Sequence, residues 1–251
     1  MDWRSLIGLA LALCAIALGF QIEGGDIAML FQPAGLLVVL AGTVGALLLQ
    51  SGPAACWQSL CLLRRSFARP RIRHKERQRM LRLWGATVRR SGALSLEGLN
   101  HNLDPFTACG LRLLVEGASA TQISTILGSD TDHFEHRRRQ LIRLWENAGG
   151  TAPTMGILGA VLGLIQVMQH LSDPLRLGSG IAVAFVSTLY GVGVANLIFL
   201  PVAARLKTQL SDELSDRDQL TEALAAIADG EPAHLVEERL ALIGVDDAPS
   251  H

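Results

Sequence analysis

The stretch that decides the fold is TAPTMGILGAVLGL, residues 151–164, which combines apolar and small residues and contains no charge. It lies in a window, 147–172, that lacks Asp, Glu, Lys and Arg. Three more windows of this kind occur, at Ser5–Ile22, Ile27–Leu63 and Leu177–Ala204. Because an α-helix needs about 20 apolar residues to cross a bilayer, we expect four transmembrane helices. They are placed at about Ser5–Ile22, Met29–Leu49, Ala152–His170 and Gly180–Ala203.

The composition of the whole chain is that of a membrane protein. Of its 251 residues, 49% are hydrophobic and 18% are charged, and the mean hydropathy is +0.33. Such a chain is too apolar to be disordered, and it is unusual for a soluble protein. The net charge of −1 argues against nucleic acid as a partner. The four cysteines (Cys14, Cys56, Cys61 and Cys109) lack the spacing of a disulfide scaffold or metal site, so no metal is expected.

The first apolar run has a second interpretation, as a signal peptide. Trp3 and Arg4 precede the run, and Ala15, Ile16 and Ala17 have the small-x-small form of a cleavage site. That triplet lies inside the apolar run rather than after it, which favours a transmembrane helix.

Basic residues in the connections predict the orientation of the chain. The connection 23–32 has two acidic residues and no basic one, whereas the stretch 51–146 has 16 basic and 8 acidic residues. Several of its arginines directly follow the second predicted span or directly precede the third. This stretch and both termini are therefore predicted to be cytoplasmic. The tail from Ala203 has 4 basic and 11 acidic residues, which either pair with the basic loop or form a separate solvated face.

Sequence patterns outside the spans predict further helices and no sheet. Apolar residues recur at helical spacing before Gly92, and Ser95 is a candidate N-cap after it. Phe106–Glu116 and Ile123–Asn147 are predicted helices, and the latter continues into the third span. We predict an all-α membrane protein with four transmembrane helices, a large helical cytoplasmic loop and a helical cytoplasmic tail. The expected domains are 1–50 (first two spans), 51–147 (cytoplasmic loop), 148–204 (last two spans) and 205–251 (acidic tail).

Polar side chains inside the predicted spans gather on the last two helices. They are Thr151, Thr154, Ser187, Thr188, Tyr190 and Asn196. We expect these helices to line a polar path or to bind a partner, while the first span faces lipid. No carboxylate lies inside any span, and a proton path usually needs an ionisable relay. If the chain conducts protons, another subunit must supply the titrating group.

The sequence contains no recognisable catalytic or cofactor-binding motif. It contains no nucleophile–base pair, phosphate loop, HExxH or CxxC motif, so we expect neither an enzyme nor a cofactor. The small residues of the last two spans, including the GxxxG pair Gly159 and Gly163, allow helix backbones to approach closely. By itself that pattern indicates packing only.

The last two spans resemble the MotA/PomA stator subunits of the bacterial flagellar motor. The resemblance rests on residues 152–164 (APTMGILGAVLGL), residues 180–191 (GIAVAFVSTLYG), and Ala195, Asn196 and Pro201. The run GLRLLVEG, residues 110–117, is similar to part of the family's cytoplasmic loop. The order of two helices, loop, two helices and tail matches over essentially the whole chain. The ExbB/TolQ proteins are similar only in the last two helices.

The resemblance implies a mechanism in the bacterial inner membrane. Copies of the chain are expected to form a pentameric A ring around the single helices of a MotB/PomB-like B subunit, which supplies the titrating Asp. Ion passage then moves the ring, whose loop pushes on a switch-complex protein of the rotor. Two alternatives stay open, an ExbB/TolQ-like proton-channel subunit that energises outer-membrane processes and a membrane scaffold without conduction.

The resemblance also assigns ion-path and coupling residues. Pro153 and Pro201 match two family prolines that couple ion passage to loop movement, and Thr188 matches a threonine of the ion path. Tyr190 lies in the same motif. Ala160 stands where sodium-driven members have a threonine. Because alanine has no oxygen to replace the water around a sodium ion, H⁺ is the expected transported ion.

Arg89, Arg90 and Glu97 resemble the basic and acidic residues that face the rotor in this family. Their expected role is attraction to complementary charges on the rotor protein, which sets docking rate and register. Either arginine is a credible basic partner. An ordinary solvated surface charge is an equally good interpretation of each residue.

Overall fold

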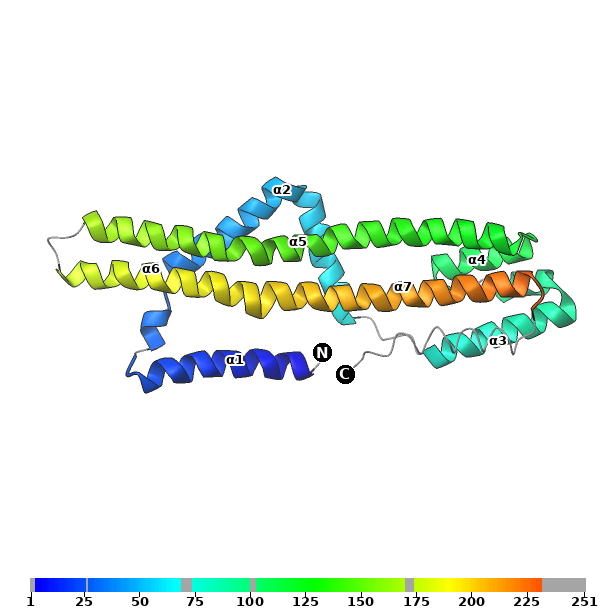
Figure 1. The fold of residues 1–251 in the computed structure, drawn as a ribbon, viewed down its shortest axis with the longest axis horizontal. Coiled ribbons are helices and arrows are strands. Elements are labelled where there is room, and N and C mark those ends of the chain that lie inside the picture. The colour runs from blue at the N-terminus through cyan, green and yellow to red at the C-terminus, as the bar shows by residue number, and fades with distance from the viewer. Residues whose placement is uncertain (1–2, 26, 69–73, 100–102, 170–173, 232–251) are drawn as a thin grey trace. The chain divides into compact units, whose positions relative to one another are not determined.

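The computed structural model describes residues 3–25, 27–68, 74–99, 103–169 and 174–231, and every regular element among them is helical (Figure 1). The elements are α1 (Trp3–Ile22), η1 (Ile27–Leu30), α2 (Pro33–Ala68), α3 (His74–Ser91), η2 (Ala93–Leu99), α4 (Pro105–Val115), α5 (Ala120–Gln169), α6 (Pro174–Val194), η3 (Ala195–Phe199) and α7 (Leu200–Ala228). Elements η1 and η2 are 3₁₀ helices, and η3 is a π-helix. The predicted all-α class is confirmed for this part of the chain. His170 lies outside it.

Three helices are long and apolar enough to cross a membrane. They are Pro33–Arg64, Ala120–Gln169 and Gly180–Ala228. A shorter apolar helix, Ile7–Ile22, forms most of α1. The prediction that helix Ile123–Asn147 continues into the next charge-free window is confirmed, because α5 is a single helix of 50 residues.

The second span differs from the prediction at both ends. Helix α2 begins at Pro33 rather than at Met29, because a proline is favoured in the first helical turn and η1 forms a separate turn before it. The helix continues past Leu49 to Ala68, with a kink at Gly52, whose φ is +75°. Glycine adopts this left-handed conformation without the steric cost that a Cβ brings.

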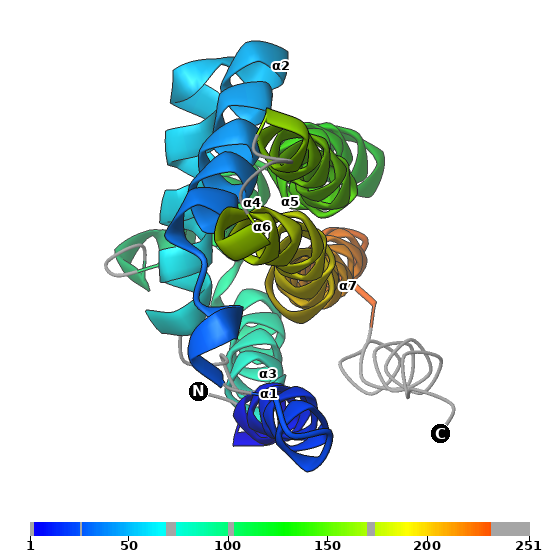
Figure 2. The ribbon, with the colours of Figure 1, turned by 90° about the vertical axis from the view of Figure 1, so that its left-hand side faces the viewer.

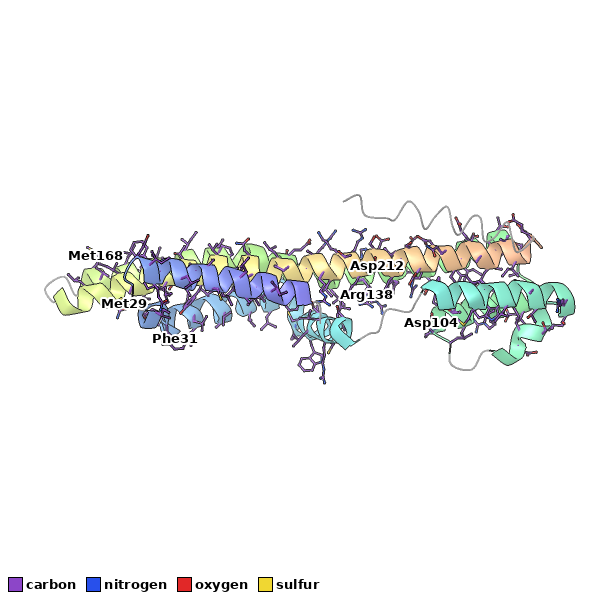
Figure 3. The ribbon with its side chains drawn as sticks, turned by 90° about the horizontal axis from the view of Figure 1, so that it is seen from below. Met29, Phe31, Asp104, Arg138, Met168 and Asp212 are labelled. Carbon is purple, nitrogen blue, oxygen red and sulfur yellow. The ribbon has the colours of Figure 1, made fainter. Side chains whose placement is uncertain are left out.

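The chain divides into two compact units. One comprises residues 1–68 and 139–208 and is called here the apolar unit; the other, residues 69–138 and 209–251, is called the loop unit. Helices α5 and α7 contribute residues to both. Large apolar side chains are exposed over the apolar unit, including Met29, Phe31 and Met168 toward the same end of it (Figure 3). Such a surface is typical of a protein that faces lipid.

The loop unit has a conventional hydrophobic core. Its largest members come from α3, η2, α4, α5 and α7: Leu81, Trp84, Leu96, Phe106, Leu111, Leu114, Ile123, Leu127, Leu220, Leu224 and Ile227. Helices α3 and α7 therefore bury apolar stripes at the spacing of one helix face. Gly110 of α4 leaves room for the side chains of Leu127 and Leu224, which a Cβ at this position would contact.

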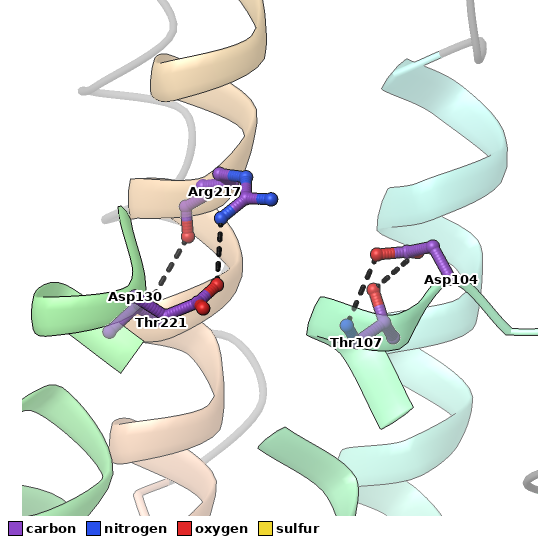
Figure 4. Close-up of polar contacts among 5 residues, drawn as sticks. All are labelled: Asp104, Thr107, Asp130, Arg217 and Thr221. Atoms are coloured by element: carbon purple, nitrogen blue, oxygen red, sulfur yellow. Dashed lines mark hydrogen bonds and ion pairs between the residues drawn. The ribbon is translucent and has the colours of Figure 1, made fainter. Parts of the chain in front are cut away.

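Local capping defines where the helices of the loop unit begin and end. Asp104 caps α4, because its carboxylate accepts from Thr107 N at 3.2 Å and from Thr107 Oγ1 at 2.7 Å (Figure 4). Ser119 and Gln122 form a reciprocal capping box at the start of α5. Ser95 is not the N-cap that the sequence suggests. Its Oγ instead donates to Gly92 O at 2.6 Å, which stabilises the turn between α3 and η2.

Arg217 of α7 ties three helices of the loop unit together. Its Nη1 lies 3.0 Å from Asp130 Oδ2 of α5 (Figure 4). The guanidinium carbon lies 4.3 Å from the ring centroid of Phe106 and 3.8 Å from that of Phe134. Because only 19% of the Arg217 side chain is exposed, solvent screens its cation–π contacts weakly, whereas the Asp130 side chain of the ion pair is 60% exposed and is screened more strongly.

The apolar unit is built on a close contact between α5 and α6, which run side by side in both views (Figures 1 and 2). A Cβ built on Gly163 of α5 would lie 2.8 Å from Ala184 N, and one built on Gly156 would lie 2.9 Å from Ser187 O. A Cβ on Gly191 of α6 would lie 2.7 Å from Ala152 O. The two backbones are therefore in direct contact along a line that we call the glycine seam. Helix α2 packs against α6 beside it.

We predict that Gly191→Ala weakens this unit. The added Cβ meets a backbone oxygen, which cannot rotate away, so the helices must separate at a cost of about 1–3 kcal/mol. The measurement is the midpoint of thermal unfolding of the detergent-solubilised chain.

The matched control is Gly193→Ala, two residues further along the same helix, where a Cβ has no atom within 4 Å. Because alanine is the better helix former, this variant is expected to unfold at the parent midpoint or above it. Equal midpoints for the two variants would contradict the seam.

Candidate functional site

The predicted ion-path and coupling residues all lie in the apolar unit. Pro153 and Ala160 are on α5, Thr188 and Tyr190 on α6, and Pro201 on α7. The first four are half-buried, and Pro201 is exposed. Two of them border the glycine seam: a Cβ on Gly191 would lie 3.2 Å from Pro153 Cα, and one on Gly156 would lie 3.3 Å from Thr188 Cα.

Hydroxyl groups along the seam bind carbonyls of their own helix. Ser187 is fully buried, and its Oγ donates to Val183 O at 2.6 Å. Thr188 Oγ1 lies 3.5 Å from Ala184 O, a long contact. Since each hydroxyl donates its hydrogen bond to a carbonyl, the lone pairs of its oxygen remain available to accept another hydrogen bond. The seam thus carries hydroxyl oxygens and no group that titrates near neutral pH.

Ser187, one of the polar residues noted in the sequence, lies at a junction of three helices that the sequence analysis did not predict. Its Oγ occupies the space beside Gly35 of α2, and a Cβ built on Gly159 of α5 would lie 2.9 Å from Ser187 Cβ. A second contact of this kind joins Gly42 of α2 to Met155 Sδ of α5. The signal in the sequence is the spacing of Gly35 and Gly42, which lets both lie on one helix face.

Tyr190 holds the backbone of the segment before α2. Its hydroxyl donates to Leu30 O and accepts from Gln32 N at 3.1 Å. Gln32 O in turn accepts from Leu36 N, so Gln32 forms the cap of α2. Tyr190 Oη therefore satisfies one of the free backbone donors at the start of this helix.

The two prolines lie where α5 meets the junction of α6 and α7. Pro153 is inside α5 rather than at its start, and its missing N–H leaves Gly149 O without the usual helical partner. Gly149 in turn packs on Leu200, because a Cβ there would lie 2.6 Å from Leu200 Cδ2. Leu200 directly precedes Pro201.

The π-helix η3 also results from the missing backbone N–H of a proline. Pro201 cannot donate to Leu197 O, and the turn before it widens so that Leu200 N donates to Ala195 O, five residues back. Opposite this turn, the rings of Trp145 and Phe199 lie 6.1 Å apart between centroids. Both helices thus have an interrupted hydrogen-bond ladder in the same region of the apolar unit.

The predicted rotor-facing residues lie around one turn of the loop unit. Arg90 is exposed near the end of α3, and Glu97 is exposed on η2. The two elements join at Gly92, whose φ of +80° reverses the chain. Arg89 also lies on α3, and its side chain is outside the described part of the structure.

Negative charge gathers where α5 and α7 meet in the loop unit. Burial raises the pKa of Asp218 above its ordinary value of 3.8, and the neighbouring carboxylates Glu135 and Asp132 raise it further. Among the described residues no group of three or more His, Cys, Asp or Glu has the geometry to hold a metal ion.

Comparison with known proteins gives two family-model matches and many relatives. Residues 99–219 match the MotA/TolQ/ExbB proton channel family, and residues 6–92 match the Motility protein A N-terminal family. Motility protein A of Bacillus subtilis is 31% identical over 242 residues, 96% of this chain and 90% of the relative. Motility protein A of Helicobacter pylori is 30% identical over 241 residues, 96% of this chain and 94% of the relative.

Two solved stator structures share the fold. The structure of C. jejuni MotAB matches with a TM-score of 0.90 and 27% identity over 99% of this chain and 98% of that one. The flagellar MotAB stator complex from Bacillus subtilis matches with a TM-score of 0.86 and 30% identity over 98% of this chain and 100% of that one.

The match over residues 99–219 and the shared helical fold place the chain in the MotA/TolQ/ExbB proton channel class, a family of channel components and not of enzymes. Within that class, the chain belongs to the motility protein A family. The resemblance noted in the sequence is confirmed. The N-terminal match favours a flagellar stator subunit over an ExbB/TolQ-like transducer, because it carries the motility protein A description.

We predict that Tyr190→Phe frees the backbone before α2 without removing the ring. Gln32 N–H and Leu30 O then lose their partner, and an unmade buried hydrogen bond costs about 1–3 kcal/mol. Amide hydrogen exchange of a peptide covering Gln32 should become about tenfold faster or more. A peptide covering Asp104 and Thr107 in the loop unit is the internal control and should be unchanged. Parent-like exchange at Gln32 would show that the hydroxyl does not hold this segment.

Proposed function

We propose that this flagellar stator subunit forms a proton channel together with a B subunit and converts ion flow into torque on the rotor. The observation that carries the proposal is the glycine seam, which is lined by hydroxyl oxygens. Residues 147–172 and 177–204, which include this part of α5 and α6, contain no carboxylate. A proton path through the membrane needs an ionisable relay. The B subunit, of the MotB/PomB kind, supplies it as a titrating Asp.

The membrane arrangement that we infer has four spans. Helix α1 is the first, α2 up to Gly52 the second, the apolar half of α5 the third, and α6 with η3 the fourth. The excess of basic residues in 51–146 supports a cytoplasmic loop, cytoplasmic termini and a place in the bacterial inner membrane. The division into 1–50, 51–147, 148–204 and 205–251 belongs to the same proposal.

The assembly that we infer is a pentameric ring of this chain around the single helices of the B subunit. The exposed apolar side chains of α5 and α6, among them Ile157, Val161 and Phe185, supply surface for neighbouring helices as well as for lipid. Because hydrophobic burial does not drive helix association within a bilayer, close packing has to hold such a ring together.

The coupling step is assigned to the region of Pro153, Pro201 and η3. A helix with missing i→i−4 hydrogen bonds bends at lower cost than a regular one. Protonation of the B-subunit Asp beside Thr188 shifts α6 at the glycine seam. Helices α5 and α7 then bend where their backbone hydrogen bonds are missing and transmit this shift toward the loop unit. The observation behind this step is the packing of Gly149 on Leu200, which joins the two proline sites.

The transported ion is expected to be H⁺, because Ala160 offers no oxygen ligand to a sodium ion. The test is swimming in soft agar by a host that lacks its own A subunit and expresses this chain with its genomic neighbour. Swimming is expected with and without sodium. Swimming only with sodium would overturn the choice of ion, and its absence despite good membrane expression of both chains would overturn the stator proposal.

A pair of threonine variants sharpens this experiment. Thr188→Ala is expected to abolish swimming, because it removes a hydroxyl from the proposed ion path. Thr208→Ala is the matched control, since Thr208 is exposed and its hydroxyl likewise donates to a carbonyl four residues back. Both variants should reach the membrane in parent amounts.

The loop is proposed to meet a switch-complex protein of the rotor through Arg89, Arg90 and Glu97. The placement of Arg90 and Glu97 on either side of the Gly92 turn supports this, because both side chains are exposed there. Opposite charges on the two partners would set docking rate and register.

We predict that Arg90→Glu reduces swimming and that a compensating charge reversal on the rotor protein partly restores it. The double variant Arg89→Glu with Arg90→Glu should reduce swimming further than Arg90→Glu alone. Arg112→Glu is the control, since Arg112 is an exposed arginine of the same unit, 3.8 Å from Glu116. Unchanged swimming in the Arg89 and Arg90 double variant would remove both residues from the rotor interface.

A further inference from the structure

The second half of α2, residues 53–68, is called here the crossing segment. Gly52 and Pro53 end the regular hydrogen bonding of the first half, and the chain turns there. Figures 1 and 2 show that this segment runs across the direction of α5 and α6, whereas the first half of α2 runs obliquely along them. All these parts belong to the apolar unit.

One face of the crossing segment is fixed to α5. Ser59 and Leu62 are buried, and Ser59 Oγ donates to Leu141 O at 2.9 Å. Just before the turn, Asn147 Nδ2 donates to Gln50 Oε1 at 3.3 Å. The segment therefore lies level with residues 141–147 of α5, where the charged half of that helix ends and the apolar half begins.

The face of the crossing segment that points away from α5 is apolar at one end and cationic at the other. Trp57 is 69% exposed and Leu60 is 52% exposed. Arg64 is exposed one turn further on, and because residues at i, i+3 and i+7 share a helix face, all three point the same way. Arg65 follows in sequence, and no Asp or Glu occurs between residues 27 and 75. The face thus combines exposed apolar surface with positive charge that no acidic residue of the same helix compensates.

We propose that this face binds anionic phospholipid at the membrane surface. The inference rests on the membrane placement given under the proposed function. Tryptophan favours the boundary between head groups and acyl chains, and Leu60 enters the acyl region beside it. Arg64 is left at the level of the lipid phosphates and binds the acidic head group. A helix that lies in the membrane plane with an apolar face and basic residues has the properties of an interfacial anchor.

The binding has a mechanical consequence for the stator. Ser59 holds the crossing segment on α5, and the lipids hold its outer face at the membrane surface. The level of Leu141 is therefore fixed relative to the bilayer, although α5 carries no charge within its own apolar half. The anchor supplies a fixed point against which the regions beyond the membrane can move.

The experiment uses full-length chain in nanodiscs of phosphatidylcholine with about one fifth phosphatidylglycerol, an anionic surface. Two samples are compared, one with bromine on the acyl chains of phosphatidylglycerol and one with bromine on the acyl chains of phosphatidylcholine. Bromine quenches tryptophan fluorescence, and the brominated lipid has the same mole fraction in both samples, so the samples differ only in which head group belongs to the brominated lipid. The signal of Trp57 is the difference between the parent and Trp57→Phe. We expect brominated phosphatidylglycerol to quench it about fivefold more than brominated phosphatidylcholine, the preference that one basic side chain gives.

Arg64→Gln tests the role of the charge. It is expected to abolish the difference between the two lipids while the total quenching of Trp57 remains. Arg112→Gln, which changes an exposed arginine of the loop unit, is the matched control and should keep the parent preference. Because Trp57 and Arg64 are exposed, neither substitution disturbs the core, and the thermal unfolding midpoint verifies this for each variant.

Two outcomes would overturn the inference. Equal quenching by the two lipids in the parent would show that the face does not select anionic head groups. No quenching by either lipid would show that protein, such as a second copy of the chain, covers it. Both results are independent of the swimming assay, so a chain that supports swimming and shows no lipid preference refutes this inference alone.

Discussion

The direct contact between the α5 and α6 backbones is the constraint on which the apolar unit depends. Lipid chains are as apolar as leucine, so burial alone does not hold these helices together, and close packing must do so. The glycines at positions 156, 163 and 191 permit it, because a Cβ at each would press on a backbone atom of the other helix. The same contact places Thr188 and Pro153 at one seam and leaves Ser187 at the junction with α2. Helix packing and the position of the proposed ion path therefore depend on the same contact.

The seam continues into a region of weakened helix. Pro153 removes a hydrogen bond from α5, and Pro201 forces the π-helical turn of η3 in the neighbouring chain segment. Gly149 and Leu200 bring the two interruptions into contact. A rigid seam next to a compliant region is a suitable arrangement for transmitting a small shift along a helix, since the displacement concentrates where hydrogen bonds are missing. The loop unit has the opposite character, because it has a conventional hydrophobic core and the Arg217 contacts join three of its helices.

Much of the fold follows from the sequence, and the exceptions have identifiable causes. The apolar residues before Gly92 correctly predict a helix, but they do not all face the core: Leu81 and Trp84 are buried, whereas Leu83 is 66% exposed because it lies on the other side of α3. Ser95 has the residue type of an N-cap, yet the turn at Gly92 gives its hydroxyl a nearer carbonyl. Pro153 has the residue type of a helix start, yet α5 continues as one helix through it. Local propensity is weak, and tertiary contacts decide between near-equal alternatives.

The sequence by itself determined the class of the protein. An α-helix that crosses a bilayer needs about 20 apolar residues, so the charge-free windows predict membrane helices. The absence of a carboxylate from these windows is the reason to propose that a partner supplies the titrating group. Only the tertiary structure decided what joins residues far apart in the chain. Tyr190 reaches the backbone at Leu30 and Gln32, and Ser59 of the crossing segment reaches Leu141 of α5. The reason is physical: a side chain's partner depends on which backbone groups the packed helices leave unsatisfied nearby, and no local pattern contains that information.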